Sequence, residues 1–266
     1  SYASRNHKEL YFTSSRDNAS GNEVDGWTGQ GFTDIFSATI DNKGKWSKPK
    51  PLTATINSIY NEGAAVMNND FNQMIFTRCG VKKKVKMGCE LYATNKNGDT
   101  WTEAEVLPFF VKDEGDDSTQ VTVGHPALSA DGKVLVFASD AEGGKGGRDL
   151  WKSTFDEEKK RWEKPVALAS INTPGDEMYP FIHADGTLYF ASNGHIGMGG
   201  LDIFMAEAQG EDWGQVTNMR SPINSSGDDF AIIFEKEQEK GFFTSNREDG
   251  KGSDAIYSFL LPALKF

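Results

Sequence analysis

The stretch Leu188-Tyr-Phe-Ala-Ser192, followed by a glycine-rich loop and then by Asp202-Ile-Phe204, decides the fold because it recurs along the chain. The same pattern of apolar, aromatic and small residues places a central phenylalanine at Phe12, Phe76, Phe137, Phe190 and Phe243. The intervals between these positions are 64, 61, 53 and 53 residues. Repetition at this period predicts one supersecondary unit per copy, with neighbouring units sharing their cores.

The order of strand signals inside one copy predicts a four-stranded blade. An apolar run such as Tyr179–Ile182 comes first, and a turn such as Asp185-Gly186 joins it to the central strand as a hairpin. After the glycine loop, a third strand opens on an acidic residue. Before the outer strand, four copies place a tryptophan at a turn: Trp46, Trp101, Trp162 and Trp213. We therefore predict an all-β fold, a five-bladed β-propeller of four-stranded antiparallel blades.

The repeat also predicts the organisation of the chain. We expect a single β-propeller domain over residues 1-266, with blades at approximately 1-58, 59-118, 119-172, 173-224 and 225-266. The first inner strand is expected to begin at Tyr2. The last copy has no tryptophan turn, so its outer strand is expected in the tail from Leu260 to Phe266 or is absent.

Composition excludes several classes of function. The chain has 39 acidic and 28 basic residues and a formal charge of −11, which opposes binding to nucleic acid and to anionic lipid. No apolar run has the length of a membrane span, so we expect no direct membrane insertion. The glycine loops, such as Gly143–Gly147, precede a strand, whereas a phosphate loop opens a helix. We therefore predict no nucleotide binding and no cofactor.

Three recurring elements carry a resemblance to a known family: Leu-Tyr-Phe-x-Ser, Gly-Gly-x-Asp-Ile-Phe and Ile-Asn-x-x-x-Asp-Glu. They resemble the PD40, or WD40-like, repeats related to the TolB propeller, and the resemblance covers nearly the whole chain. They look most like the version in Bacteroidetes cell-envelope proteins of the OmpA family, including type IX secretion components. The resemblance implies a non-catalytic protein-protein interaction scaffold in a periplasmic, peptidoglycan-anchored envelope or secretion complex. Its partners would be other envelope or secretion-system proteins, with peptidoglycan bound only through a separate domain.

Glu62, Glu177 and Asp229 occupy matching positions just before inner strands, where side chains of a propeller line the central channel. One hypothesis makes them a ligand-binding or carbohydrate-active site at the channel mouth, since glycosidases use such carboxylate pairs. The other makes them part of the repeat itself, with Val123 replacing the acid in the third copy. No Ser, His and Asp set has a recognisable nucleophile motif. We therefore predict no catalytic residue and no enzyme activity.

An acidic residue opens every third strand: Asp34, Glu90, Asp149, Asp202 and Asp254. A carboxylate there accepts hydrogen bonds from the amides of its own loop, which ties the loop to the strand. Because every copy has the residue, we predict this structural role and no metal. The alternative is a calcium ion held in each blade by carboxylate and carbonyl oxygens.

The second copy departs most from the repeat. Cys79 and Cys89 lie at the two ends of one loop, and they are either a hairpin-closing disulfide or two free thiols. Two cysteines without a nearby histidine are too few for a zinc site. Between them stand Lys82, Lys83, Lys84 and Lys86. In an acidic chain, this concentration of positive charge predicts a surface for an anionic partner. The alternative is a solvated loop tip.

Overall fold

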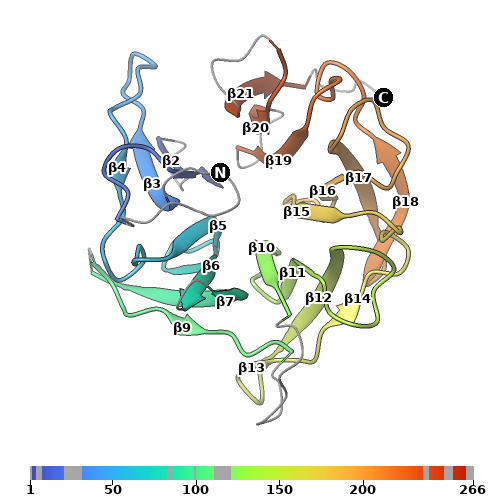
Figure 1. Cartoon of the computed structure of the whole chain (residues 1–266), viewed down its shortest axis with the longest axis horizontal. Helices are drawn as coiled ribbons and strands as arrows, with labels where there is room; N and C mark the ends of the chain where they lie inside the picture. Colours follow the sequence, from blue (N-terminus) through green and yellow to red (C-terminus); the bar gives the residue numbers. More distant parts are fainter. Residues whose placement is uncertain are drawn as a thin grey trace. The chain divides into compact units, whose positions relative to one another are not determined.

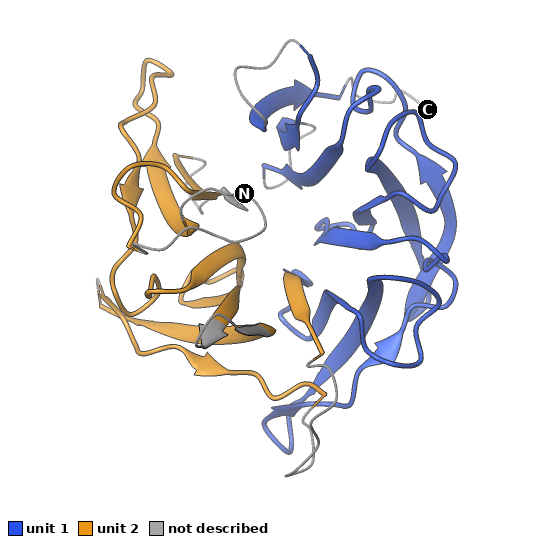
Figure 2. Cartoon of the chain, in the orientation of Figure 1, with its two compact units in different colours: residues 1, 127–266 blue, residues 2–126 orange. Residues whose placement is uncertain are grey.

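The computed structural model describes residues 2–3, 8–20, 32–82, 85–98, 100–110, 121–235, 240–248 and 254–261. Regular structure in these ranges consists of β-strands (Figure 1). The same ranges contain no helix with the length and apolar character that crossing a membrane requires. The chain divides into two compact units, an N-terminal one of Tyr2–Pro126 and a C-terminal one of Ala127–Phe266 (Figure 2). A single domain over residues 1-266 stays a prediction.

The N-terminal unit contains two antiparallel sheets, which we call the first and second blades. Their strands are β1 (Tyr2–Ala3), β2 (Glu9–Ser14), β3 (Asp34–Thr39), β4 (Lys50–Pro51), β5 (Asn61–Met67), β6 (Gln73–Lys82), β7 (Val85–Asn97), β8 (Thr100–Trp101) and β9 (Glu105–Val106). The first blade has the order β1-β2-β3-β4. The second has the order β5-β6-β7-β8, with β9 also paired to β7.

The third, fourth and fifth blades follow, and the first strand of the third blade begins before the boundary between the units. Their strands are β10 (Val123–Leu128), β11 (Val134–Ser139), β12 (Asp149–Asp156), β13 (Arg161–Trp162), β14 (Val166–Ala167), β15 (Glu177–Ile182), β16 (Leu188–Ser192), β17 (Asp202–Gln209), β18 (Asp212–Asn218), β19 (Asp229–Phe234), β20 (Lys240–Ser245) and β21 (Ala255–Leu260). The orders are β10-β11-β12-β13 with β14 on β12, then β15-β16-β17-β18, then β19-β20-β21.

These sheets confirm the predicted fold class, an all-β five-bladed propeller of antiparallel blades. The extra short strands β9 and β14 do not add a strand position, because β8 with β9, and β13 with β14, are two pieces of one outer strand. The first inner strand begins at Tyr2, as predicted. In the fifth blade the described strands number three. The outer strand was expected from Leu260 to Phe266 or was expected to be absent; Leu260 is instead the last residue of the third strand, β21, and residues 262–266 lie outside the described residues.

The recurring phenylalanine is buried in the core of each blade, and in the first, second, fourth and fifth blades it stacks on an aromatic residue of the third strand. The ring centroids of Phe190 and Phe204 lie 5.9 Å apart, and those of Phe76 and Tyr92 lie 6.0 Å apart. Phe76 and Phe190 are fully buried. Burial of large aromatic side chains supplies most of the stabilisation of a small sheet, so one residue type at one repeat position specifies each core.

Every inner strand from β5 to β19 contains a residue with a left-handed backbone in its interior. These residues are Ala64 (φ 44°), His125 (φ 54°), Tyr179 (φ 52°) and Ala231 (φ 53°). In β5, β15 and β19 the pairing register shifts at the same place, which is the signature of a β-bulge. The strands also begin earlier than the apolar runs predicted, so Glu62, Glu177 and Asp229 lie inside them.

Two kinds of hydrogen bond join a blade to the chain that enters the next one. In the first, the amide just before a third strand donates to a side chain just before or at the start of the following inner strand. The pairs are Thr33 to Asn61, Arg148 to Asp176 and Leu201 to Asp228, each at 2.8 Å. In the second, which we call the asparagine clip, a buried asparagine bonds to both the N–H and the C=O of one residue of the third strand. The pairs are Asn57 with Ile35, Asn172 with Leu150 and Asn224 with Ile203.

Candidate functional site

Glu177 is the first residue of β15, and its carboxylate is fully buried in the fourth blade. One oxygen accepts the amide of Thr173 at 2.7 Å. The other accepts the hydroxyls of Thr173 at 2.6 Å and Ser192 at 2.7 Å. All three donors belong to the same blade or to the loop that leads into it, so the carboxylate closes this loop on its own strand.

Glu62 has the same arrangement in the second blade with one charged donor. Its carboxylate accepts the amide of Ser58 at 3.0 Å, the hydroxyl of Ser58 at 2.5 Å and the Nε of Arg78 at 2.7 Å. Arg78 also donates to the carbonyl of Ile56 at 2.8 Å, and its guanidinium lies 4.5 Å from the ring centre of Tyr92. Burial raises the pKa of Glu62, and the bonds from Ser58 and Arg78 oppose this effect.

Asp229 repeats the ion pair in the fifth blade. Its carboxylate accepts the amide and hydroxyl of Ser225 at 2.6 and 2.8 Å, and Nη2 of Arg247 at 2.6 Å. Thus each of the three predicted ligand-binding acids uses both oxygens within its own blade. These bonds support the interpretation that the three acids belong to the repeat, where each closes the loop before its own inner strand. Ligand binding at Glu62, Glu177 and Asp229 stays a prediction.

The strand-opening aspartates bind their own glycine loops, as the sequence predicted for this position. One oxygen of Asp149 accepts the amides of Lys145 and Gly146 at 2.8 and 3.1 Å. Asp202 accepts those of Met198 and Gly199 at 2.7 and 2.9 Å. Asp34 accepts the amide and hydroxyl of Ser20.

The remaining two members of that set differ. Glu90 is exposed, and its carboxylate lies 3.5 Å from the hydroxyl of Tyr92. The loop before Asp254 includes residues 249–253, which lie outside the described residues. Within the described ranges, no group of three or more His, Cys, Asp or Glu side chains is arranged to hold a metal ion. Calcium binding stays an untested alternative.

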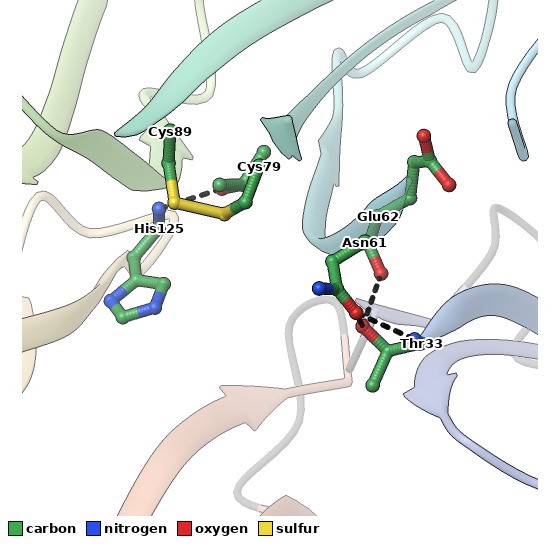
Figure 3. The surroundings of a disulfide bond; sticks show 7 residues. Thr33, Asn61, Glu62, Cys79, Cys89 and His125 are labelled. Atoms are coloured by element: carbon green, nitrogen blue, oxygen red, sulfur yellow. Dashed lines mark hydrogen bonds between the residues drawn. A yellow bond between two sulfur atoms is a disulfide. The ribbon is translucent and has the colours of Figure 1, made fainter. Parts of the chain in front are cut away.

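The hairpin of β6 and β7 is the largest departure from the repeat. These strands have 10 and 13 residues, and their pairing continues past Cys79 to the pair Lys82 and Val85, whereas the described pairing of β5 with β6 reaches Cys79. Cys79 and Cys89 face each other across the hairpin, with Cα atoms 4.0 Å apart, and form a disulfide (Figure 3). The disulfide therefore joins the two strands where the hairpin extends beyond β5.

The predicted partner-binding lysines belong to this extension. The backbones of Lys82 and Lys86 are part of β6 and β7, and each pairs across the hairpin. Lys83 and Lys84, and the side chains of Lys82 and Lys86, lie outside the described residues. Figure 3 shows that the nearby Glu62 directs its carboxylate away from the disulfide, so this acid and the hairpin are separate features of the second blade.

Sequence reasoning missed two sets of residues. The asparagine clip had a visible signal, because Ile-Asn recurs at Ile56-Asn57, Ile171-Asn172 and Ile223-Asn224. The arginine partners had a partial signal, because Ser-x-Arg recurs at Ser14-Ser15-Arg16 and Ser245-Asn246-Arg247. Arg247 reaches Asp229 from this position, two residues beyond the one that faces the acid, whereas Arg78 directly faces Glu62 across the sheet. Arg78 therefore lies outside the recurring pattern.

No family model matches the chain, and no curated protein sequence does. Solved structures do match. TolB from Acinetobacter baumannii superposes with a TM-score of 0.51 at 13% identity, over 84% of this chain and 46% of that one. The fold is that of a TolB-like β-propeller. The chain therefore spans less than half of that TolB structure.

Enzymes share the same fold. The periplasmic gluconolactonase PpgL of Pseudomonas aeruginosa gives a TM-score of 0.51 at 13% identity, over 98% of this chain and 67% of that one. An exo-β-1,3-galactanase from Clostridium thermocellum gives a TM-score of 0.54 at 12% identity, over 94% of this chain and 56% of that one. At such identities the likeness concerns the fold alone, because propellers carry unrelated functions.

Proposed function

We propose that the chain is a non-catalytic protein-binding scaffold of a periplasmic cell-envelope complex, and that the β6–β7 hairpin contacts the partner. The observation that carries this proposal is the extension of that hairpin beyond β5, joined by the Cys79–Cys89 disulfide at its base. An insertion on a regular scaffold is a common position for recognition. The disulfide at its base limits the conformations of the free hairpin, which lowers the entropy cost of binding a partner.

Charge supports an acidic partner. The extension contains Lys82, Lys83, Lys84 and Lys86 within a chain of formal charge −11. A compact positive region on an otherwise negative surface steers an acidic partner toward one place and disfavours other approaches. The disulfide supports an oxidising compartment such as the periplasm, since structural disulfides are rare in the cytosol.

The finer part of the proposal rests on the resemblance of the repeats. We propose that the chain belongs to a peptidoglycan-anchored protein of the OmpA family, such as the type IX secretion component PorE. Other envelope or secretion-system proteins would then be the partners, and a separate domain would bind peptidoglycan.

The alternative function, a carbohydrate-active or ligand-binding propeller, has less support from the geometry. Glycoside hydrolysis needs two carboxyl groups that face one substrate. Glu177 and Asp229 are instead buried and bonded to donors of their own blades. A ligand would have to replace these bonds.

The test reverses the charge of the hairpin. A variant with Lys82, Lys83, Lys84 and Lys86 all changed to Glu should lose defined envelope proteins that co-purify with the wild type after cross-linking in cells. The matched control changes four exposed lysines of the first blade, Lys43, Lys45, Lys48 and Lys50, to Glu. Equal co-purification by both variants and the wild type would show that the hairpin is not the interface.

A further inference from the structure

We propose that the fourth blade carries a second docking surface, made of Ile196, Met198 and Arg220, for a protein segment that combines apolar side chains with carboxylates. The surface lies within the C-terminal unit. It does not depend on the lysine hairpin, which belongs to the N-terminal unit.

Two apolar side chains on one loop are exposed to solvent. Ile196 is 96% exposed and Met198 is 52% exposed. A single exposed apolar residue is ordinary, but this glycine loop exposes two large ones, Ile196 and Met198, within three residues. Their solvation is unfavourable unless another molecule covers them.

The loop that presents them is held in place at nearly every residue. The hydroxyl of Ser192 accepts the amides of Gly194 at 2.9 Å and His195 at 3.2 Å. The ring of His195 bonds to the carbonyl of Ile171 at 2.7 Å and packs on Phe204.

Further along the loop, Asn218 donates to the carbonyl of Ile196 at 3.2 Å, and Asp202 accepts the amides of Met198 and Gly199. The exposed side chains therefore project from a fixed backbone, which lowers the entropy cost of docking.

The repeat does not require these residues. In the third blade, Asp149 holds the corresponding loop by the same pair of amide bonds, yet the position of Met198 is occupied by Lys145. The amine of Lys145 bonds to the carbonyl of Ala169 at 2.6 Å, so its chain lies along the protein. The loop therefore forms with a polar residue at this position, and the repeat itself does not call for the apolar pair of the fourth blade.

Arg220 supplies a positive charge on the backbone segment next to the loop. The side chain of Asn218 bonds at one end to the carbonyl of Ile196 and at the other to the amide of Arg220, at 2.6 Å, so the two backbones lie on either side of one amide group. Arg220 is exposed and has a left-handed backbone with φ 56°.

The chemistry of these three side chains indicates the occupant. Methionine and arginine are both enriched at the centre of protein interfaces. The exposed guanidinium favours carboxylates on the partner. A lipid surface is disfavoured, because a chain of charge −11 is repelled by anionic headgroups.

The experiment selects binders from a random phage-displayed peptide library against the whole chain. We expect enriched peptides with aliphatic or aromatic residues next to Asp or Glu. Their affinity should fall about tenfold or more in Ile196→Ser/Met198→Lys and in Arg220→Glu. The lysine copies Lys145 of the third blade, so the loop is expected to fold, which the thermal unfolding midpoint checks. The control Val166→Ser changes another exposed apolar residue of this unit and should leave affinity unchanged.

Several results would overturn the proposal. These are the absence of peptides whose binding depends on the three residues, binding of wild type but not variant to phosphatidylcholine vesicles, and a wild-type dimer in sedimentation that the variant loses. The chain with all four hairpin lysines changed to Glu should bind the same peptides as wild type. Failure of the envelope co-purification test is therefore distinguishable from failure of this one.

Discussion

The second and fourth blades place the same acid in the same position and neutralise it differently. Glu62 and Glu177 each accept an amide and a hydroxyl from the residue four positions earlier, Ser58 or Thr173. The remaining donor is the charged Arg78 in one blade and the neutral Ser192 in the other. The comparison shows that a buried acid that closes a loop can be satisfied by an ion pair in one blade and by a neutral hydroxyl in another.

The largest loss of stability should come from breaking the ion pair between Glu62 and Arg78. Glu62→Val leaves the guanidinium of Arg78 mostly buried without its anion, which should destabilise the protein by about 3 kcal/mol. The double variant Glu62→Val/Arg78→Ser copies Val123 and Ser139 of the third blade, and should recover about 1 kcal/mol or more. Chemical denaturation measures both, and a double variant as unstable as the sum of the singles would contradict the ionic explanation.

A smaller effect should follow from removing the disulfide, which the fourth blade does not need. Cys79→Ser/Cys89→Ser should cost about 2 kcal/mol, because the reduced chain has more conformations when unfolded. Hydrogen exchange should accelerate in β6 and β7 and remain unchanged in β16 and β17. Faster exchange in all four strands would mean that the bond supports more than the hairpin.

Loss of the acid should destabilise the fourth blade less, because the donors to Glu177 are neutral. Glu177→Val leaves the amide of Thr173 without its acceptor, while the hydroxyls of Thr173 and Ser192 rotate to other partners, so we expect a loss of about 1–2 kcal/mol. Denaturation under the conditions used for Glu62→Val gives the comparison. A loss equal to that of Glu62→Val would mean that the charge of Arg78 is not what distinguishes the blades.

The smallest effect concerns pH. Burial raises the pKa of Glu62 above its ordinary value of 4.5, so the folded protein binds this proton more tightly than the unfolded chain. The resulting stabilisation is complete below the ordinary pKa and is lost as pH rises through the raised one. The stability advantage of wild type over Glu62→Gln should therefore narrow as pH rises above 4.5. Parallel curves for the two proteins would contradict the direction of the shift.

The sequence predicted the features that recur and failed on those that depend on three-dimensional neighbours. The central phenylalanines and the opening aspartates repeat, so their strands and loop bonds were predictable. The left-handed residues Ala64 and Tyr179 were not, because neither residue type favours that backbone and only the surrounding sheet imposes it. Exposure of Ile196 was also unpredictable, since an apolar residue in a glycine loop is equally compatible with burial.

The hydrogen bonds between blades have a consequence for dividing the chain. Asp176 and Asp228 accept amides of the preceding blade, while the asparagine clip holds that blade to the linker that leaves it. A cut after Asn172 therefore keeps the clip and loses the acceptor of Arg148. The smallest fragment that keeps both kinds of hydrogen bond is a blade together with the first residues of the next one. Recombinant fragments and blade exchanges that end at this overlapping boundary should be more stable than those cut at intervals of one repeat.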